Sequence, residues 1–282
     1  MTASGMWHFA LAALILSVGS APATAADASA WDQDVRSGLR LIAGDSSRPA
    51  ADGALRAGAE IKLAPGWKTY WRYPGDTGVP PRFDFSESTN VKSVSVLWPA
   101  PHRFHDGGGD SIGYKEHVIF PLRVTPQDPS KPVTLRISAE YGICEKLCVP
   151  VQTKAELALD GGPSSQDAPL VAAEALVPVP GAVGEDASFA IRSVRKEAGP
   201  SGPRVVVEVV APAGDAVDLF AEGPTAEWAL PLPAAAPGDT AQAQRFTFDL
   251  DGAPRGAATE GAELTLTAVA GARALEVKAR LD

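Results

Sequence analysis

The sequence predicts an all-β fold of two antiparallel β-sandwiches joined by a short linker with a helical segment. A length of 282 residues corresponds to about two domains. The 27 glycines and 25 prolines favour many turns, and therefore short strands over long helices. Apolar residues recur in short alternating runs, with no long helical pattern between them.

The first 25 residues are predicted to be a signal peptide. An apolar run, Phe9–Gly19, precedes the A-x-A-like cleavage site Ala21–Ala25. The run is too short to span a bilayer, which takes about 18 apolar residues or more. We therefore expect the protein to be secreted to the periplasm and to be soluble after cleavage. Cysteines can form disulfides in that oxidising compartment.

The first sandwich is expected at residues 27–160. Short runs with strand character alternate there with turn signals. The Pro/Gly-rich segment Pro74–Pro81 cannot be helical. The predicted strands are Leu39–Ala43, Ala59–Leu63, Trp67–Tyr73, Val91–Trp98, Val118–Val124, Val133–Tyr141 and Val151–Leu159.

Residues 161–186 are predicted to be the linker, with a short helix that Asp167 caps, that runs through Val177 and that Pro178 and Pro180 end. The second sandwich is expected at residues 187–282, which hold no cysteine or histidine, so its role is spacing or docking. Its clearest strand runs are Phe189–Ile191, Val205–Val210, Arg245–Leu250, Leu264–Val269 and Leu275–Val277.

Charge and motifs exclude several classes of function. The net charge of −9 at pH 7 would repel a phosphate backbone, so no nucleic-acid partner is expected. The sequence has no P-loop or dinucleotide fingerprint, and we expect no cofactor. Gly109–Gly113 matches the G-x-S-x-G pattern, but without the strand before it and the helix after it that a nucleophile elbow needs.

Candidate chemistry is concentrated in the two cysteines, Cys144 and Cys148. A straight strand would hold their Cα atoms about 13 Å apart, so the chain must fold back for a disulfide to form. A bridge that closes so short a loop stabilises little, about 2 kcal/mol in the entropic model. Close spacing is typical of pairs that open and close, so a redox role and a structural role both stay open.

A metal site is the other alternative. His102 and His105 have H-x-x-H spacing and, with the two cysteines, would form a Cys₂His₂ set for copper or zinc. Both histidines lie in a Pro/Gly-rich stretch, and their spacing is atypical of zinc fingers. His102, His105 and His117 read more simply as polar loop or strand-edge residues, so no metal is expected.

Three ordered motifs resemble the N-terminal periplasmic region of DsbD-type thiol:disulfide interchange proteins, and most closely the copper-sensitivity-suppressor branch. The resemblance covers roughly residues 38–160. The motifs are Trp67–Pro80, with the pattern W-x-T-Y-W-x-x-P-G-D-x-G-x-P, Gly113–Pro121, and Tyr141–Pro150 around the cysteines.

The resemblance implies an immunoglobulin-like domain whose cysteine pair shuttles between dithiol and disulfide, which makes both expected sandwiches immunoglobulin-like. Cys148 would then form the mixed disulfide and Cys144 would resolve it. Such protein-disulfide reductase-type exchange implies periplasmic thioredoxin-like oxidoreductases as partners. The chain has no membrane hub of its own, so a membrane electron-transfer protein would act in trans.

A cap loop that shields the pair is implied at His105–Ser111. It contains His105, Asp106, Gly107, Gly108 and Gly109, with glycines where the best-known relatives have an aromatic residue. Shielding would then be weaker or would come from Trp71 or Phe104. Tyr141, Pro150 and Trp71 are the expected supporting residues. The competing hypothesis is a non-catalytic scaffold with an inert disulfide.

Overall fold

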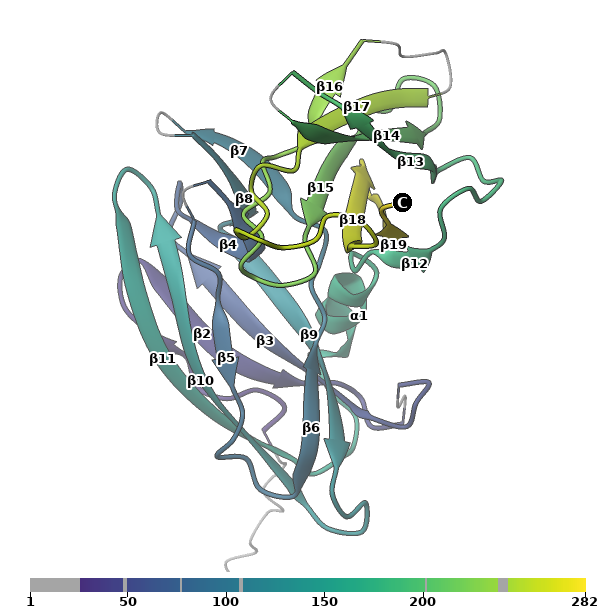
Figure 1. Ribbon diagram of the computed structural model, residues 1–282. Coiled ribbons are helices and arrows are strands. Elements are labelled where there is room, and N and C mark those ends of the chain that lie inside the picture. Colours follow the sequence, from purple (N-terminus) through teal and green to yellow (C-terminus); the bar gives the residue numbers. More distant parts are fainter. Residues whose placement is uncertain (1–25, 48–49, 77, 107–108, 201, 238–242) are drawn as a thin grey trace, which may run out of the picture.

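The computed structural model describes residues 26–47, 50–76, 78–106, 109–200, 202–237 and 243–282. The predicted signal peptide lies outside these residues. Two β-sandwiches follow one another along the chain, and the single described helix, α1 (Asp167–Glu174), lies between them (Figure 1). The predicted all-β architecture is confirmed. No helix in the described part of the chain is long and apolar enough to cross a membrane.

Two sheets make up the first sandwich. The first has the order β1-β2-β3-β9-β6 and consists of β1 (Asp32–Gln33), β2 (Ser37–Ala43), β3 (Leu55–Leu63), β9 (His117–Pro126) and β6 (Val91–Val96). The second has the order β11-β10-β4-β8-β7, with β5 also paired to β10, and consists of β11 (Cys148–Leu159), β10 (Val133–Cys144), β4 (Lys68–Gly75), β8 (Gly109–Lys115), β7 (His102–Asp106) and β5 (Arg82–Asp84). All of these pairings are antiparallel.

The second sandwich also has two sheets. One has the order β12-β19-β18-β15, from β12 (Val179–Gly181), β19 (Arg273–Arg280), β18 (Glu263–Ala270) and β15 (Asp218–Glu222). The other has the order β13-β14-β17-β16, from β13 (Ala190–Ala198), β14 (Pro203–Val210), β17 (Ala243–Asp249) and β16 (Ala234–Ala236). β12 pairs with β19 in parallel, so the second sandwich takes its first strand from the segment predicted as linker.

The alternating strand patterns produce the cores. Leu39, Leu41, Ile61, Phe120 and Leu135 are completely buried between the sheets of the first sandwich, because strand side chains point alternately to the two faces. The core cluster of the first sandwich also includes Phe220 and Val269 of the second. The two sandwiches are therefore joined by a shared apolar contact.

Helix α1 is docked on the first sandwich. Its Leu170 packs with Ile42 and Ile119. Asp167, predicted to cap the helix, is its first helical residue, and the N-cap position is held by Gln166, which makes no side-chain capping hydrogen bond. Asp167 instead accepts a hydrogen bond from Arg56 at 2.7 Å, so the carboxylate ties the helix to the sheet. The helix ends at Glu174, earlier than the prolines predicted to end it.

Candidate functional site

Cys144 and Cys148 form a disulfide at the tip of the β10–β11 hairpin. They are the last residue pair of the ladder, with Cα atoms 4.2 Å apart, so the chain folds back between them as the spacing required. Cys144 is 9% exposed, whereas Cys148 lies on the surface. The two sulfurs therefore differ in access, and an incoming protein can reach the Cys148 side of the bond.

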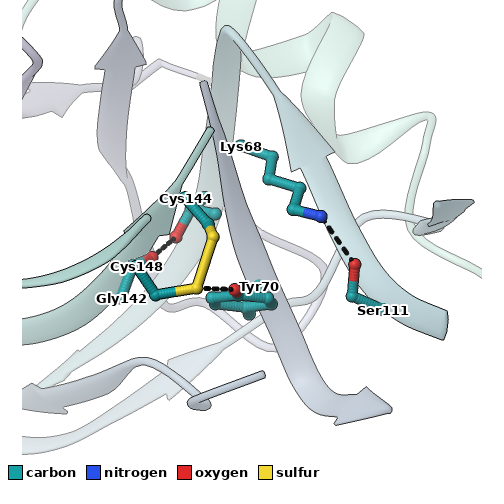
Figure 2. Close-up of a disulfide and its surroundings, with 7 residues drawn as sticks. Lys68, Tyr70, Ser111, Gly142, Cys144 and Cys148 are labelled. Atoms are coloured by element: carbon teal, nitrogen blue, oxygen red, sulfur yellow. Dashed lines mark hydrogen bonds between the residues drawn. A yellow bond between two sulfur atoms is a disulfide. The ribbon is translucent and has the colours of Figure 1, made fainter. Parts of the chain in front are cut away.

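The hydroxyl of Tyr70 contacts the disulfide. Its Oη lies 3.2 Å from Sγ of Cys148, and the side chain is almost completely buried (Figure 2). Burial raises the pKa of Tyr70, so the phenol keeps its proton at neutral pH and can donate to the sulfur.

Gly142, in β10, makes room for that aromatic ring. A Cβ atom at Gly142 would lie 3.1 Å from Tyr70 Cε2, tighter than an ordinary contact. The carbonyl of Gly142 also accepts a hydrogen bond from Oγ1 of Thr69 at 2.9 Å, which holds β4 against β10 (Figure 2). A small residue beside the cysteines therefore lets β4 place Tyr70 at the disulfide.

A buried lysine, Lys68, lies in β4 next to the disulfide. Lys68 is paired in register with Cys144 on one side and Lys115 on the other. Its Nζ donates to Oγ of Ser111 at 2.9 Å, pointing away from the disulfide (Figure 2). Burial, and then the nearby Lys115 charge, lowers the pKa of Lys68. The ring of Phe104 lies 5.5 Å from Nζ of Lys68 and 5.0 Å from that of Lys115.

A groove of about 460 Å³ opens beside Cys148. Its lining is largely apolar and comes from Tyr70 of β4, the segment with Val79, Pro80 and Arg82, and the facing strands of the β10–β11 hairpin. Val79 is 59% exposed at this edge, and Leu147, at the hairpin tip, is 73% exposed. The groove therefore presents an apolar binding surface next to the accessible Sγ of Cys148.

The aromatic and Pro/Gly motif builds one side of this groove, with Tyr70, Val79 and Pro80 in its lining. Gly78 packs so closely on the Tyr70 ring that a Cβ there would lie 2.6 Å from Cδ1. The chain reaches this position through a turn at Gly75, whose φ of +80° favours glycine. The segment predicted only to be non-helical thus forms one wall of the site, which sequence reasoning did not identify.

Two of the residues expected to support the cysteines, Tyr141 and Pro150, belong to the groove lining. Tyr141 is buried, and its hydroxyl is 3.3 Å from Oγ of Ser37. Pro150 pairs with Gly142 and is exposed in the groove lining. Trp71 is different: it is completely buried and its ring centroid lies 5.7 Å from that of Phe220. Trp71 therefore supports the contact between the sandwiches rather than the cover of the disulfide.

The described residues of the segment expected to be a cap loop belong to the paired strands of a β-hairpin, β7–β8. Gly107 and Gly108 lie outside the described residues. Asp106 pairs with Gly109 in the ladder, and His105 Nδ1 lies 2.5 Å from a carboxylate oxygen of Asp110. In the sheet, β4 lies between this hairpin and β10. A gating role for the hairpin stays a prediction.

The histidines are not gathered around the cysteines. His102 and His105 belong to β7, separated from β10 by β8 and β4. His117 begins β9, in the other sheet, where its Nε2 is 2.8 Å from Glu60. Within the described ranges, no three His, Cys, Asp or Glu side chains form a group that could hold a metal ion.

Ser111, the serine of the G-x-S-x-G match, lies in β8 and is completely buried. Its hydroxyl accepts a hydrogen bond from Lys68.

Comparison with protein families identifies the site-bearing segment. Residues 40–160 match the family model described as thiol:disulfide interchange protein DsbD, N-terminal. The resemblance predicted from the sequence is confirmed. This DsbD-like segment (residues 40–160) contains both cysteines, Tyr70 and the groove wall.

The fold of nearly the whole chain resembles a solved structure, the N-terminal periplasmic domain of ScsB from Proteus mirabilis. The TM-score is 0.70 at 21% sequence identity, and the match covers 90% of this chain and 98% of that one. The shared fold thus extends past the DsbD-like segment into the second sandwich. No curated protein matches the chain.

Proposed function

We propose that the protein is a periplasmic thiol–disulfide exchange module that passes reducing equivalents through Cys144 and Cys148. The observation that carries the proposal is the asymmetric disulfide, with a buried Cys144 and an exposed Cys148 beside an apolar groove. A bridge kept only for stability gains little from so short a loop. The DsbD family match supports the same chemistry.

Reduction of the module begins with a donor thiolate, which attacks the accessible Sγ of Cys148. The Cys144–Cys148 bond breaks, a donor–Cys148 disulfide forms, and Cys144 leaves as a thiolate. The donor's second thiolate then attacks the donor sulfur that is bonded to Cys148. This attack forms a disulfide within the donor and releases Cys148 as a thiolate. Two electrons have moved to the module, and the donor keeps a disulfide.

Delivery to a client reverses these roles. The Cys148 thiolate attacks a client disulfide, one client sulfur leaves as a thiolate, and a Cys148–client disulfide forms. The Cys144 thiolate then attacks Sγ of Cys148, restoring the bridge and releasing the client as a dithiol. The Tyr70 hydroxyl, within hydrogen-bond reach of Cys148 Sγ, would stabilise negative charge on that sulfur in both directions.

The partners we propose are periplasmic thioredoxin-like oxidoreductases as clients, with a membrane electron-transfer protein as donor in trans. The groove beside Cys148 suits a loop of such a partner, because Val79 and Leu147 present apolar surface around the reactive sulfur. The resemblance to the copper-sensitivity-suppressor branch makes copper tolerance the physiological setting we propose.

Trapping of the mixed disulfide tests the proposal. Four proteins are compared: wild type, Cys144→Ala, Cys148→Ala and the double variant. Each is first reduced and then mixed with an oxidised thioredoxin-like protein. Non-reducing electrophoresis then follows the adducts. Cys144→Ala should accumulate a long-lived adduct, because the resolving thiol is missing, whereas Cys148→Ala and the double variant should form none.

The reduction potential of the pair is the second test. An exchangeable pair should equilibrate with glutathione or thioredoxin, whereas structural bridges have potentials below about −300 mV. A potential in that lower range, together with no adduct from Cys144→Ala, would overturn the proposal and leave the scaffold hypothesis.

A further inference from the structure

Three consecutive residues of β4 attach directly to the second sandwich. Trp71 packs on Phe220, with ring centroids 5.7 Å apart. The Tyr73 hydroxyl donates to the carbonyl of Leu230. Between them, the Arg72 guanidinium stacks over Trp71 at 4.4 Å. This stretch of β4 immediately follows Tyr70, the residue that contacts the disulfide.

Arg72 anchors the interface electrostatically. Its guanidinium donates three hydrogen bonds to the Glu222 carboxylate, at 2.7, 2.9 and 3.1 Å, and a further one to Glu276. Burial lowers the pKa of Arg72, but the two carboxylates outweigh it and raise the pKa overall. Both acids belong to the second sandwich, Glu222 to β15 and Glu276 to β19. The charge of Arg72 is thus held in place by two separate strands of the other domain.

A second anchor comes from β7. Arg103 donates to the carbonyls of Leu219 and Pro233 at 3.2 and 3.1 Å, and its Nε lies 3.2 Å from a carboxylate oxygen of Asp218. The same guanidinium is 3.8 Å from Asp110, across its own hairpin. Arg103 therefore links the second sandwich to the start of β8.

Asp110 continues this link to the groove wall. The amide of Asp76 donates to the carbonyl of Asp110 at 3.0 Å, and a Cβ atom at Gly75 would lie 2.7 Å from the same oxygen. The turn is thus fixed against β8 just before the chain reaches Gly78, Val79 and Pro80. Those residues cover Tyr70 and line the groove beside Cys148.

We infer that the second sandwich is a positioning element of the disulfide site. Through Arg72 and Arg103 it fixes β4 and the turn after it, and so sets the place of Tyr70 and of the groove wall at Val79 and Pro80. The inference rests on the proposed exchange function and deepens it. The domain without cysteines thereby determines how well a protein partner fits against Cys148.

Removing charge on the far side of the interface tests this inference. Glu222→Gln combined with Glu276→Gln leaves every residue of the first sandwich unchanged. Glu208→Gln is the matched control, because Glu208 pairs with Arg195 within the second sandwich at 2.8 Å. Tyr73→Phe is a milder interface variant in case the double variant fails to fold, which circular dichroism and thermal unfolding would show.

Two rate constants are measured for each protein: reduction of the Cys144–Cys148 disulfide by a reduced thioredoxin and by dithiothreitol. A protein donor uses the groove, but dithiothreitol does not. The thioredoxin-to-dithiothreitol ratio should fall at least about threefold in the interface variant, as expected for coupling carried through packed contacts. Glu208→Gln should keep the wild-type ratio. An unchanged ratio, or equal slowing by both reductants, would overturn the inference.

Hydrogen exchange separates this inference from the proposed function. Amides of peptides covering residues 78–83 should exchange faster in the interface variant than in Glu208→Gln, because the groove wall has lost an anchor. If no protein thiol reduces even the wild-type disulfide, the exchange function is wrong. Faster exchange at residues 78–83 would then still support the positioning role, and unchanged exchange would overturn that role as well.

Discussion

Tyr70 and Trp71 are neighbours in β4 that serve opposite faces of the sheet. The Tyr70 hydroxyl lies 3.2 Å from Sγ of Cys148, and the Trp71 ring packs on Phe220 of the second sandwich. Successive strand side chains point to opposite sides, so one short stretch of backbone serves both the disulfide and the domain contact. Substitutions at these two positions should therefore separate chemistry from assembly.

Replacing Tyr70 by Phe should change the reactivity of Cys148 with little change in the fold. A hydrogen bond of this kind contributes about 0.5–1.5 kcal/mol, so its loss should make the Cys148 thiolate roughly two- to tenfold less favoured in the reduced protein. The pH dependence of alkylation by iodoacetamide measures this as a higher thiol pKa. Tyr141→Phe is the control, since that hydroxyl contacts Ser37. Identical alkylation profiles for Tyr70→Phe and wild type would contradict the role given to Tyr70.

Replacing Trp71 by Ala should destabilise the protein. The side chain is completely buried, and truncation of a buried tryptophan costs about 3–5 kcal/mol. Urea denaturation followed by circular dichroism measures the change in the free energy of unfolding. Val35→Ala, at a residue that is 92% exposed, should have little effect. Equal stabilities for the two variants would be inconsistent with the packing of Trp71.

Gly113 should not tolerate a side chain. A Cβ atom there would lie 1.9 Å from the carbonyl oxygen of Thr69 and 2.8 Å from Cα of Tyr70, so β4 and β8 would have to separate. Overpacking of this kind costs about 1–3 kcal/mol, and Gly113→Ala should also displace Tyr70 from the disulfide. Gly181→Ala is the matched control, because its nearest neighbours would be 3.6 Å away. Thermal unfolding of both variants checks the difference.

Glu174 should make the docking of α1 sensitive to acid. Burial raises the pKa of its carboxyl, but hydrogen bonds from Arg56 and Arg123 outweigh burial and lower the pKa below the usual 4.5. A carboxyl whose pKa is depressed in the folded state stabilises the fold above its unfolded pKa. That contribution is lost as the pH falls through the folded value.

Glu174→Gln should therefore cost about 1–3 kcal/mol at pH 7 and progressively less as the pH falls below 4.5, the usual pKa of the carboxyl. Denaturant titrations across that range measure the difference from wild type. Glu263→Gln removes an exposed ion pair with Lys278 and serves as the comparison. A penalty for Glu174→Gln that stays constant with pH would rule out the ion pairs as its cause.

The two-sandwich architecture could be predicted because alternating apolar residues fix which strand face is buried. Runs such as Ala59–Leu63 and Leu264–Val269 carry that pattern in the sequence itself. The fold-back at Cys144 and Cys148 followed from the reach of a disulfide alone. These predictions depend on neighbouring residues, so one sequence was enough to make them.

The contacts around the disulfide depend on sheet order, which no local pattern contains. Tyr70 and Trp71 are both large and aromatic, and only the placement of β4 beside β10 decides which of them faces the sulfur. Lys68 reads as an ordinary surface lysine until β8 brings Ser111 to its amine. The glycines at 107–109 suggested a loop, yet His102–Asp106 and Gly109–Lys115 pair as antiparallel strands.

The disulfide closes a twelve-residue ladder only at its last rung, with Glu145, Lys146 and Leu147 beyond it. Opening the bond therefore leaves the remaining backbone pairing of β10 and β11 in place to hold the domain together. Glu145, Lys146 and Leu147 are exposed and lie outside the paired strands, so they can be replaced without changing the core. If the proposed exchange function holds, exchanging them should change which oxidoreductase the protein prefers, while the interior stays as it is.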